Sequence, residues 1–88
     1  MEYKGPDSVY EFQQDWTVEL GGDTINTSTW TVESGLTKDS DTKTSTAATI
    51  WLSSGTLGKV YKIANKIVTA GSRTFEQTWF IKIENILI

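Results

Sequence analysis

Three groups of residues have types that could do chemistry, and none has the spacing that the chemistry needs. Asp39-Ser40-Asp41 resembles the start of a calcium-binding loop. Such a loop also needs a third oxygen ligand, a central glycine and a distal glutamate. Lys43 stands where the third acid belongs, so we predict no calcium site.

The other two groups are a carboxylate pair and a glycine-rich turn. Asp15 and Glu19 on one strand would lie roughly 13 Å apart, too far for two carboxylates that act across one bond. Gly55-Thr56-Leu57-Gly58 is not followed by the Gly-Lys-Ser/Thr sequence or the helix of a phosphate-binding loop. The chain has no Cys and no His, which removes thiolate chemistry and the commonest general base. We predict that the protein is not an enzyme and has no cofactor or metal.

The composition is typical of one small β domain. Thr and Ser together make up a quarter of the 88 residues, and Thr suits the pleated surface of a strand. Four Trp, three Tyr and three Phe add large apolar area to a small core. No apolar run is long enough to span a bilayer, and the first residues are no signal peptide. We therefore expect a protein made in a cytoplasm, with no membrane partner.

The formal net charge of −3 hides a difference between the two halves of the chain. Residues 1–45 hold nine acids and three bases, whereas residues 46–88 hold five bases and two acids. Five scattered bases do not form the concentrated basic stripe of a nucleic-acid-binding protein, so we expect no nucleic-acid partner. A solvated polar surface is one interpretation of the asymmetry. The other is that patches of opposite sign meet when copies assemble.

Alternating apolar and polar residues predict strands from residue 9 onwards. Residues 1–8 hold turn-forming residues without periodicity, so we expect a flexible N-terminus. Trp16, Val18 and Leu20 alternate with polar residues. This pattern predicts a short strand, a bend at residues 13–15 and a longer second strand.

Further strands are predicted on either side of a polar stretch. Residues 25–32 predict a strand with Trp30 facing the core. Residues 37–46 contain almost nothing but Thr, Ser, Asp and Lys, which indicates a loop with one short edge strand at most. In the later strands Asn65 shares its parity with Tyr61, Ile63 and Ile67, so Asn65 would need a hydrogen-bond partner in a buried row.

The stretch around which these strands are arranged runs from residue 47 to residue 63. It reads as a strand, a turn with Gly55 and Gly58, and a second strand that Tyr61 opens. In immunoglobulin-like sandwiches a tyrosine at this corner bonds back to the backbone. We predict such a tyrosine corner at Tyr61, with an ordinary hairpin and a chance tyrosine as the alternative.

About seven short strands with turns every 8–12 residues predict the fold class. We predict an all-β, immunoglobulin-like (fibronectin III-like) antiparallel β-sandwich without a disulfide. It forms a single domain over residues 9–88. Its core should include Trp30, Ile50, Tyr61, Trp79 and Ile81.

Two aromatic residues have the wrong parity for this core. Trp51 and Phe80 each lie between residues that we expect to face inward. Large aromatic side chains on a wet surface are typical of partner-binding surfaces, although one aromatic packed across a polar sheet is the alternative. The apolar end of the chain is a further exposed feature. The candidate interface therefore consists of Trp51, Phe80, Ile86, Leu87 and Ile88.

Several blocks spread over residues 15–83 occur together in one known family. They are Asp23-Thr24-Ile25, Ser28-Thr29-Trp30-Thr31-Val32, Gly35-Leu36-Thr37, Ala48-Thr49-Ile50-Trp51-Leu52-Ser53, Gly55-Thr56 with Gly58 and Tyr61, Ile67-Val68-Thr69, and Arg73-Thr74. In these blocks the chain resembles the phage fiber-tail adaptor proteins, small structural proteins of tailed phages and prophages. Two turns depart from the family. Ser54 stands where the family often has a second glycine, and Ala70-Gly71-Ser72 carries its glycine one place early.

The resemblance implies a non-enzymatic virion structural or adaptor protein that is made in the bacterial host cytoplasm. We expect it to bind other virion proteins and copies of itself, and to be a monomer or weak homo-oligomer in isolation. The alternative function is a stand-alone immunoglobulin-like binding module for a carbohydrate or cell-surface ligand. A groove lined with Asn, Asp or Gln beside an exposed aromatic favours this alternative, whereas an aromatic on a flat sheet face or edge favours the virion protein.

Overall fold

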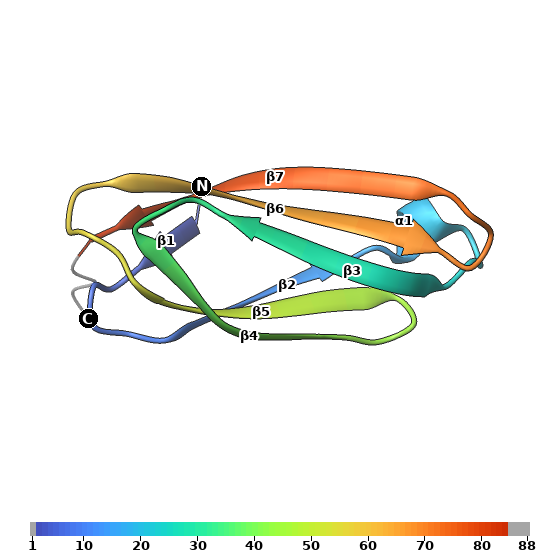
Figure 1. Cartoon of the computed structure of the whole chain (residues 1–88), viewed down its shortest axis with the longest axis horizontal. Helices are drawn as coiled ribbons and strands as arrows, with labels where there is room; N and C mark the ends of the chain where they lie inside the picture. The colour runs from blue at the N-terminus through green and yellow to red at the C-terminus, as the bar shows by residue number, and fades with distance from the viewer. Residues whose placement is uncertain (1, 85–88) are drawn as a thin grey trace.

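Two β-sheets packed face to face make up the computed structural model, which describes residues 2–84 (Figure 1). The four-stranded sheet has the order β1-β7-β6-β3, and the three-stranded sheet has the order β2-β5-β4. The strands are β1 (Glu2–Lys4), β2 (Tyr10–Asp15), β3 (Ile25–Val32), β4 (Leu36–Lys43), β5 (Ala47–Ser54), β6 (Val60–Thr69) and β7 (Thr74–Ile83). Seven strands in two sheets confirm the predicted β-sandwich.

The core lies between the two sheets and follows from the alternation of side chains along each strand. Of the residues predicted to face inward, Trp30, Ile50, Tyr61 and Ile81 are buried. Trp79 is half-buried and packs against the same core. Phe12 and the two tryptophans form one cluster, with ring centroids 6.2 Å between Phe12 and Trp30, 4.9 Å between Phe12 and Trp79, and 5.9 Å between Trp30 and Trp79.

The N-terminus is the first correction to the sequence prediction, because Glu2–Lys4 form β1. This strand runs parallel to β7, with Glu2 opposite Ile81 and Lys4 opposite Ile83. The Lys4 side chain is fully buried, and its Nζ donates to the carbonyls of Gly5 and Ser54, each at 2.7 Å. Burial lowers the pKa of the Lys4 ammonium, against the opposite effect of nearby carboxylates. Three residues are too few for an alternating pattern to reveal a strand.

The second correction concerns residues 16–20, which were predicted as a strand. β2 ends at Asp15, and α1 (Thr17–Leu20) follows. The Asp15 carboxylate accepts hydrogen bonds from the backbone N–H and the hydroxyl of Thr17, which lower the pKa of Asp15 and turn the chain into the helix. Trp16 and Leu20 are buried on one side, but Val18 is 88 % exposed. No helix among residues 2–84 is long and apolar enough to cross a membrane.

The third correction is β4, which was predicted to be mainly a loop. The strand is eight residues long and pairs with β5. Its register shifts between Lys38 and Ser40, which places a bulge at Asp39. Most of its side chains are exposed, so the strand lacks the apolar alternation that predicts strands from a sequence. Its charges and its bulge are features that protect an edge strand from unwanted pairing.

Asn65 lies inside the sandwich with the partners that its predicted burial requires. Its side chain is fully buried. Its Oδ1 accepts a hydrogen bond from Trp16 Nε1 at 2.9 Å, and its Nδ2 donates to Ser28 Oγ at 2.9 Å and to the Thr29 carbonyl at 3.3 Å. Asn65 on β6 thus holds both β3 and the residue before α1.

Candidate interaction surfaces

The turn between β5 and β6 is held by Tyr61. The Tyr61 hydroxyl accepts a hydrogen bond from the backbone N–H of Thr56 at 2.9 Å, and hydrogen bonding from Thr56 lowers the pKa of Tyr61. Gly35 (φ 102°) lies against the ring, where a Cβ atom would be 2.9 Å from Tyr61 Cε1. The hydrogen bond between the Thr56 N–H and the Tyr61 hydroxyl is the backbone contact that a tyrosine corner requires.

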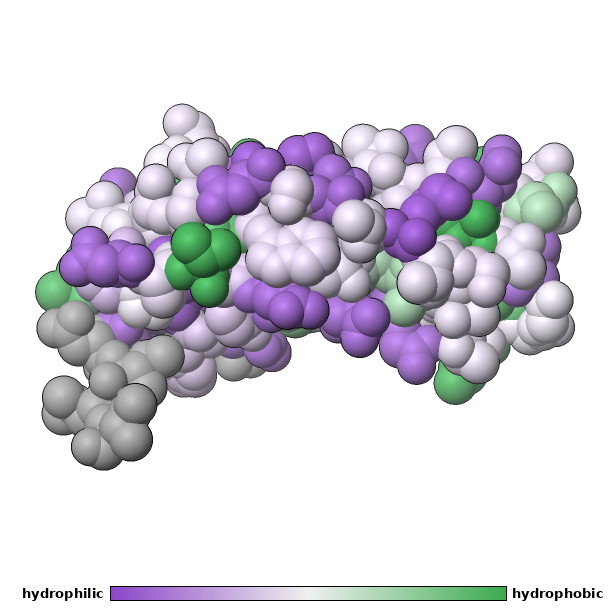
Figure 2. Space-filling model, turned by 90° about the horizontal axis from the view of Figure 1, so that it is seen from below, coloured by the Kyte–Doolittle hydropathy of each residue, from purple (hydrophilic) through white to green (hydrophobic). Residues whose placement is uncertain are grey.

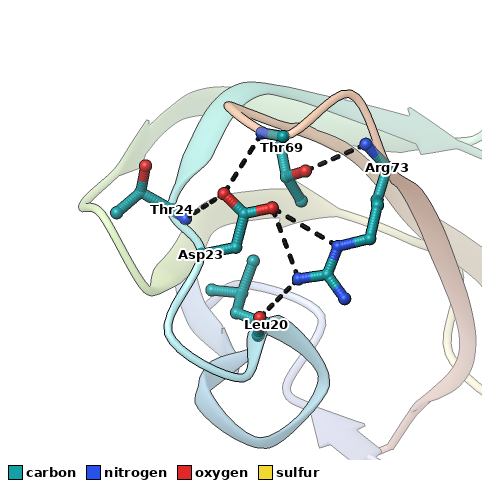
Figure 3. A network of polar contacts seen from close by, with 6 residues as sticks. Leu20, Asp23, Thr24, Thr69 and Arg73 are labelled. Carbon is teal, nitrogen blue, oxygen red and sulfur yellow. Dashed lines mark hydrogen bonds and ion pairs between the residues drawn. The ribbon is translucent and has the colours of Figure 1, made fainter.

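A polar network joins the turn after α1 to the turn between β6 and β7 (Figure 3). Asp23 Oδ1 accepts hydrogen bonds from the backbone N–H groups of Thr24 at 2.8 Å and Gly71 at 3.2 Å. Asp23 Oδ2 accepts from Arg73 Nε and Nη2, each at 3.3 Å. Arg73 Nη2 also donates to the Leu20 carbonyl. The network ties together two turns that are about 50 residues apart in the chain.

This network was missed at the sequence level, although both of its ends belong to the quoted family blocks. Asp23 and Arg73 are 50 residues apart, and nothing in either block indicates the other. Hydrogen bonds from Thr69 and from the backbone N–H of Thr24 hold the pKa of the Asp23 carboxyl below its usual value. Among residues 2–84 no group of three or more acidic side chains could hold a metal ion. The contacts of Asp23 and Arg73 hold two turns together, which is a structural role.

The outer side of the four-stranded sheet carries a patch that we call the aromatic-basic face. It consists of Tyr3, Val60, Lys62, Phe80 and Lys82. Tyr3 and Val60 flank Lys82 in one row across three strands, and Lys62 lies opposite Phe80 in a neighbouring row. Tyr3 is 48 %, Val60 42 % and Phe80 49 % exposed. Half of the exposed large apolar residues of the described chain therefore lie in one patch.

An open cavity of about 320 Å³ lies beside Phe80 and is lined by Glu2, Thr78, Trp79 and Phe80. Glu2 Oε1 accepts a hydrogen bond from the Tyr10 hydroxyl at 2.9 Å. Burial, together with this bond to the Glu2 carboxylate, raises the pKa of Tyr10 to about 12. The cavity has no Asn, Asp or Gln in its lining, so it lacks the feature that would favour a carbohydrate-binding module.

The outer side of the three-stranded sheet is a second patch, which we call the acidic face. It consists of Glu11, Asp15, Asp39 and Trp51. Trp51 lies opposite Glu11 on β2, and its neighbours along β5 are buried, so the side chain faces outward as predicted. It is, however, only partly exposed. Figure 2 views the molecule from this side and shows a mainly polar surface with separate apolar patches.

The two outer faces differ in charge. Three lysines point outward from the four-stranded sheet, and each has a glutamate beside it: Lys62 has Glu33, Lys66 has Glu76 and Lys82 has Glu84. The outer side of the three-stranded sheet carries the three acids of the acidic face. Lys38 and Lys43 of β4 are exposed too, but they lie opposite the buried Leu52 and Ala48 and so point away from that outer side. The acidic first half of the sequence thus gives one acidic face, whereas the lysines of the second half share their face with glutamates.

Of the five candidate interface residues, Phe80 and Trp51 lie on opposite outer faces. Ile86, Leu87 and Ile88 lie outside the described residues. The patch around Phe80 also contains Tyr3 and Val60, which the sequence analysis did not single out. Tyr3 was missed because β1 was not predicted. Val60 was missed although its position directly before the inward-facing Tyr61 indicates an outward side chain.

Comparison with known proteins agrees with the resemblance. The family described as podophage GP4 fiber-tail adaptor protein gp77 matches residues 4–82. A search of curated proteins finds no match. The family match spans five strands completely, from β2 to β6, and most of β7, and it includes Tyr61, Trp51 and Phe80. The chain therefore belongs to the podophage GP4 fiber-tail adaptor protein gp77 family and is a non-enzymatic structural protein of the phage virion.

Proposed function

We propose that this adaptor, which contacts other virion proteins, makes one of its contacts through the aromatic-basic face. The observation that carries the proposal is Phe80, which is 49 % exposed on the outer side of the four-stranded sheet and lines the open cavity there. Tyr3 and Val60 lie beside it at similar exposure. Covering a large apolar side chain with a partner contributes about 1.5–3 kcal/mol. Such residues at the centre of an interface supply most of its binding energy.

Charged side chains surround the apolar side chains of the same face. Lys62 and Lys82 flank them, with Glu33 beside Lys62 and Glu84 beside Lys82. Contacts of such exposed charges with a partner contribute little each and weaken as the salt concentration rises. We infer that the partner presents an apolar patch with charged residues of both signs around it.

Trp51 and the end of the chain complete the proposed interface. An adaptor between two assemblies needs at least two binding surfaces, and Phe80 and Trp51 lie on opposite sides of the sandwich. Trp51 has Glu11 as its cross-strand neighbour, so its partner would be basic. Residues 86–88 are apolar and would add contact area. Each surface alone is small, so we expect the isolated protein to be a monomer or to associate weakly.

The proposal is tested by assembling phage particles with altered adaptors. Phe80→Ala should reduce the copy number of the protein in purified particles, because the partner loses its main apolar contact. Adding Trp51→Ala should reduce it further. Quantitative mass spectrometry of particles measures the copy number, and thermal melting checks that each variant keeps the stability of the parent.

Val18→Ala is the matched control. Val18 is 88 % exposed on α1, which lies at the opposite end of the sandwich from β1 (Figure 1). The Val18→Ala substitution also removes apolar surface, but none from the aromatic-basic face. Normal incorporation of Phe80→Ala would show that Phe80 is only a sheet-packing residue.

A further inference from the structure

We propose that two copies of this chain pair along the free part of β7, antiparallel to each other and about a two-fold axis at Gln77. β1 pairs with residues 81–83 of β7. Among residues 2–84 no strand pairs with residues 74–80 on that side. Over these residues β7 is therefore a free edge of the four-stranded sheet, along the upper margin of the molecule in Figure 1. A free edge is a template for a further strand.

The backbone of this edge has hydrogen-bonding groups without partners. Glu84 N–H donates to Lys4 at the end of β1, whereas the N–H and C=O groups of Ile83 bond on the β6 side. β7 pairs with β6 without a register shift, so these two directions alternate along the strand. The N–H and C=O groups of Glu76 and Thr78 thus point away from β6, and they have no partner among the residues that the structure describes.

The inward side chains of β7 lose their cover along the same stretch. Ile81 and Ile83, which lie beside β1, are fully buried. Phe75 and Trp79 share their parity but are only partly buried, and Gln77 between them is exposed. The open cavity described above lies where β1 ends. A strand added beside β7 would continue the line of β1 and cover this row.

The other edges of the sandwich have features that discourage pairing. The register shifts after Ile25 in β3 and at Asp39 in β4, and β2 has two acids among its six residues. Bulges and charged side chains protect sheet edges, as lysine and proline do. Residues 74–80 contain no lysine and no proline, and their register is continuous. This edge is therefore the one that is open to a strand.

The stretch is complementary to itself in one register, which selects a second copy as the occupant. With Gln77 opposite Gln77 of the second copy, Phe75 lies opposite Trp79 of that copy. Aromatic pairs across two strands stabilise a sheet, so each copy supplies an aromatic side chain that covers one of the other. The Gln77 amide both donates and accepts hydrogen bonds. The two amides can therefore pair with each other across the axis.

Charge and space agree with this register and exclude its neighbours. Glu76 is opposite Thr78 of the second copy and lies beside Lys66 of its own sheet, so no like charges are directly opposite each other. An axis at Glu76 would place that carboxylate opposite its own copy, which is unfavourable. An axis at Thr78 would drive the start of the second β7 into the place that β1 occupies.

This pairing leaves the aromatic-basic face open. Residues directly opposite each other in a sheet point to the same side, so both copies present their outer faces on one side of a continuous sheet. Phe80 lies outside the paired residues 75–79. Two such faces held together bind a partner with two matching sites more tightly than one face does. The pairing goes beyond the proposed function and does not depend on it.

Sedimentation velocity of the full chain measures the association in solution. The average mass should rise with protein concentration to that of a dimer and no further, because a two-fold contact is closed. Gln77→Lys and Gln77→Glu should each weaken the association roughly fivefold, because each places like charges opposite each other across the axis. An equimolar mixture of the two variants should associate more strongly than either alone, because opposite charges then meet there.

Asn26→Lys and Asn26→Glu are the matched controls. Asn26 is also an exposed amide, but it lies on β3, at the opposite edge of the same sheet. Both control variants should associate as the parent does. Thermal melting checks that every variant keeps the stability of the parent.

The absence of cysteine in the sequence allows a direct test of the register. The backbone groups of Gln77 face β6, so the pair across the axis is of the closer, non-hydrogen-bonded kind, with about 4.5 Å between the Cα atoms. A disulfide can span this distance. In a glutathione buffer, Gln77→Cys should form a disulfide-linked dimer several times faster than Asn26→Cys.

Three results would each overturn the pairing: a parent that stays monomeric at the highest attainable concentration, a mixture that associates no more than its components, or equal disulfide formation by Gln77→Cys and Asn26→Cys. None of these results concerns the particle. If Phe80→Ala still lowers incorporation, the proposed function stands without the dimer. If the dimer is found and Phe80→Ala incorporates normally, the proposed function fails by itself.

Discussion

Ser54 and Ser72 adopt a left-handed backbone, with φ of 67° and 64°. They are the two non-glycine residues with positive φ among residues 2–84. The left-handed region costs an ordinary L-residue roughly 1 kcal/mol relative to glycine. Both serines lie where the chain departs from the glycine pattern of its family. The departures are therefore places where this chain tolerates backbone strain, a property that only the backbone angles reveal.

Ser72→Gly should stabilise the protein. Glycine relieves the strain at positive φ but adds freedom to the unfolded chain, so we expect a net gain of about 0.5 kcal/mol, or a few degrees in Tm. Differential scanning calorimetry measures the shift. Ser34→Gly is the control, because Ser34 is exposed in a turn without positive φ, and it should lower Tm or leave it unchanged. A lower Tm for Ser72→Gly would mean that the Ser72 side chain contributes more than its backbone strain costs.

Elements with one buried face could be predicted from the sequence, and the others could not. β3, β5, β6 and β7 have alternating apolar residues that follow the core, and all were expected. β1 is too short for a pattern, and β4 has almost no buried face. Trp16 and Leu20 share a parity that fits a strand, but they are also four residues apart, which fits a helix. Asp15, through its bonds to Thr17, decides between the two.

Asp23→Asn tests how strongly the Asp23–Arg73 network holds the turn after α1 to the turn between β6 and β7. The pKa of Asp23 is lower in the folded protein than the value of about 3.9 in an unfolded chain. Its stabilising contribution is therefore complete above that unfolded value and is lost as the pH falls through the folded pKa. We expect Asp23→Asn to be less stable than the parent at pH 6, and the difference to shrink below about pH 4.

Urea unfolding midpoints between pH 2 and pH 7 measure this difference. Glu19→Gln on α1 removes an exposed carboxylate outside the network and should follow the pH profile of the parent. A constant gap between Asp23→Asn and the parent at every pH would contradict an electrostatic role. The Asp23 side chain would then act through its hydrogen-bond geometry alone.

For the whole molecule, the sequence was sufficient for the sandwich and insufficient for its surfaces. The corner at Tyr61 was expected from the turn before it, which contains Gly55 and Gly58. The core residues and the outward direction of Phe80 follow from parity, which is a local property. The aromatic-basic face does not, because it joins β1, β6 and β7, whose order in the sheet no local pattern states. The charge difference between the two halves was visible in the sequence. Which acids gather on the outer side of the three-stranded sheet depends on which strands share that sheet.

The parallel pairing of β1 with β7 gives the domain a mechanical property. Under tension between Glu2 and Glu84, the load runs along both strands, so the bonds between them are strained together in shear. The Glu84 N–H bond to the Lys4 carbonyl and the bonds of Lys4 Nζ lie in the same load path. Tension between Lys59 and Glu84 instead opens the β6–β7 hairpin one pair at a time, because Val60 lies opposite Lys82.

The absence of cysteine in the sequence makes pairs of introduced thiols unique handles for single-molecule pulling. We expect a clearly higher rupture force for Glu2→Cys/Glu84→Cys than for Lys59→Cys/Glu84→Cys at the same loading rate, since forced unfolding follows the rate of barrier crossing. Equal forces would mean that β1 separates before the sandwich bears the load. With the expected difference in force, a virion component of this kind would resist tension applied through its two ends and yield to tension applied across the β6–β7 hairpin.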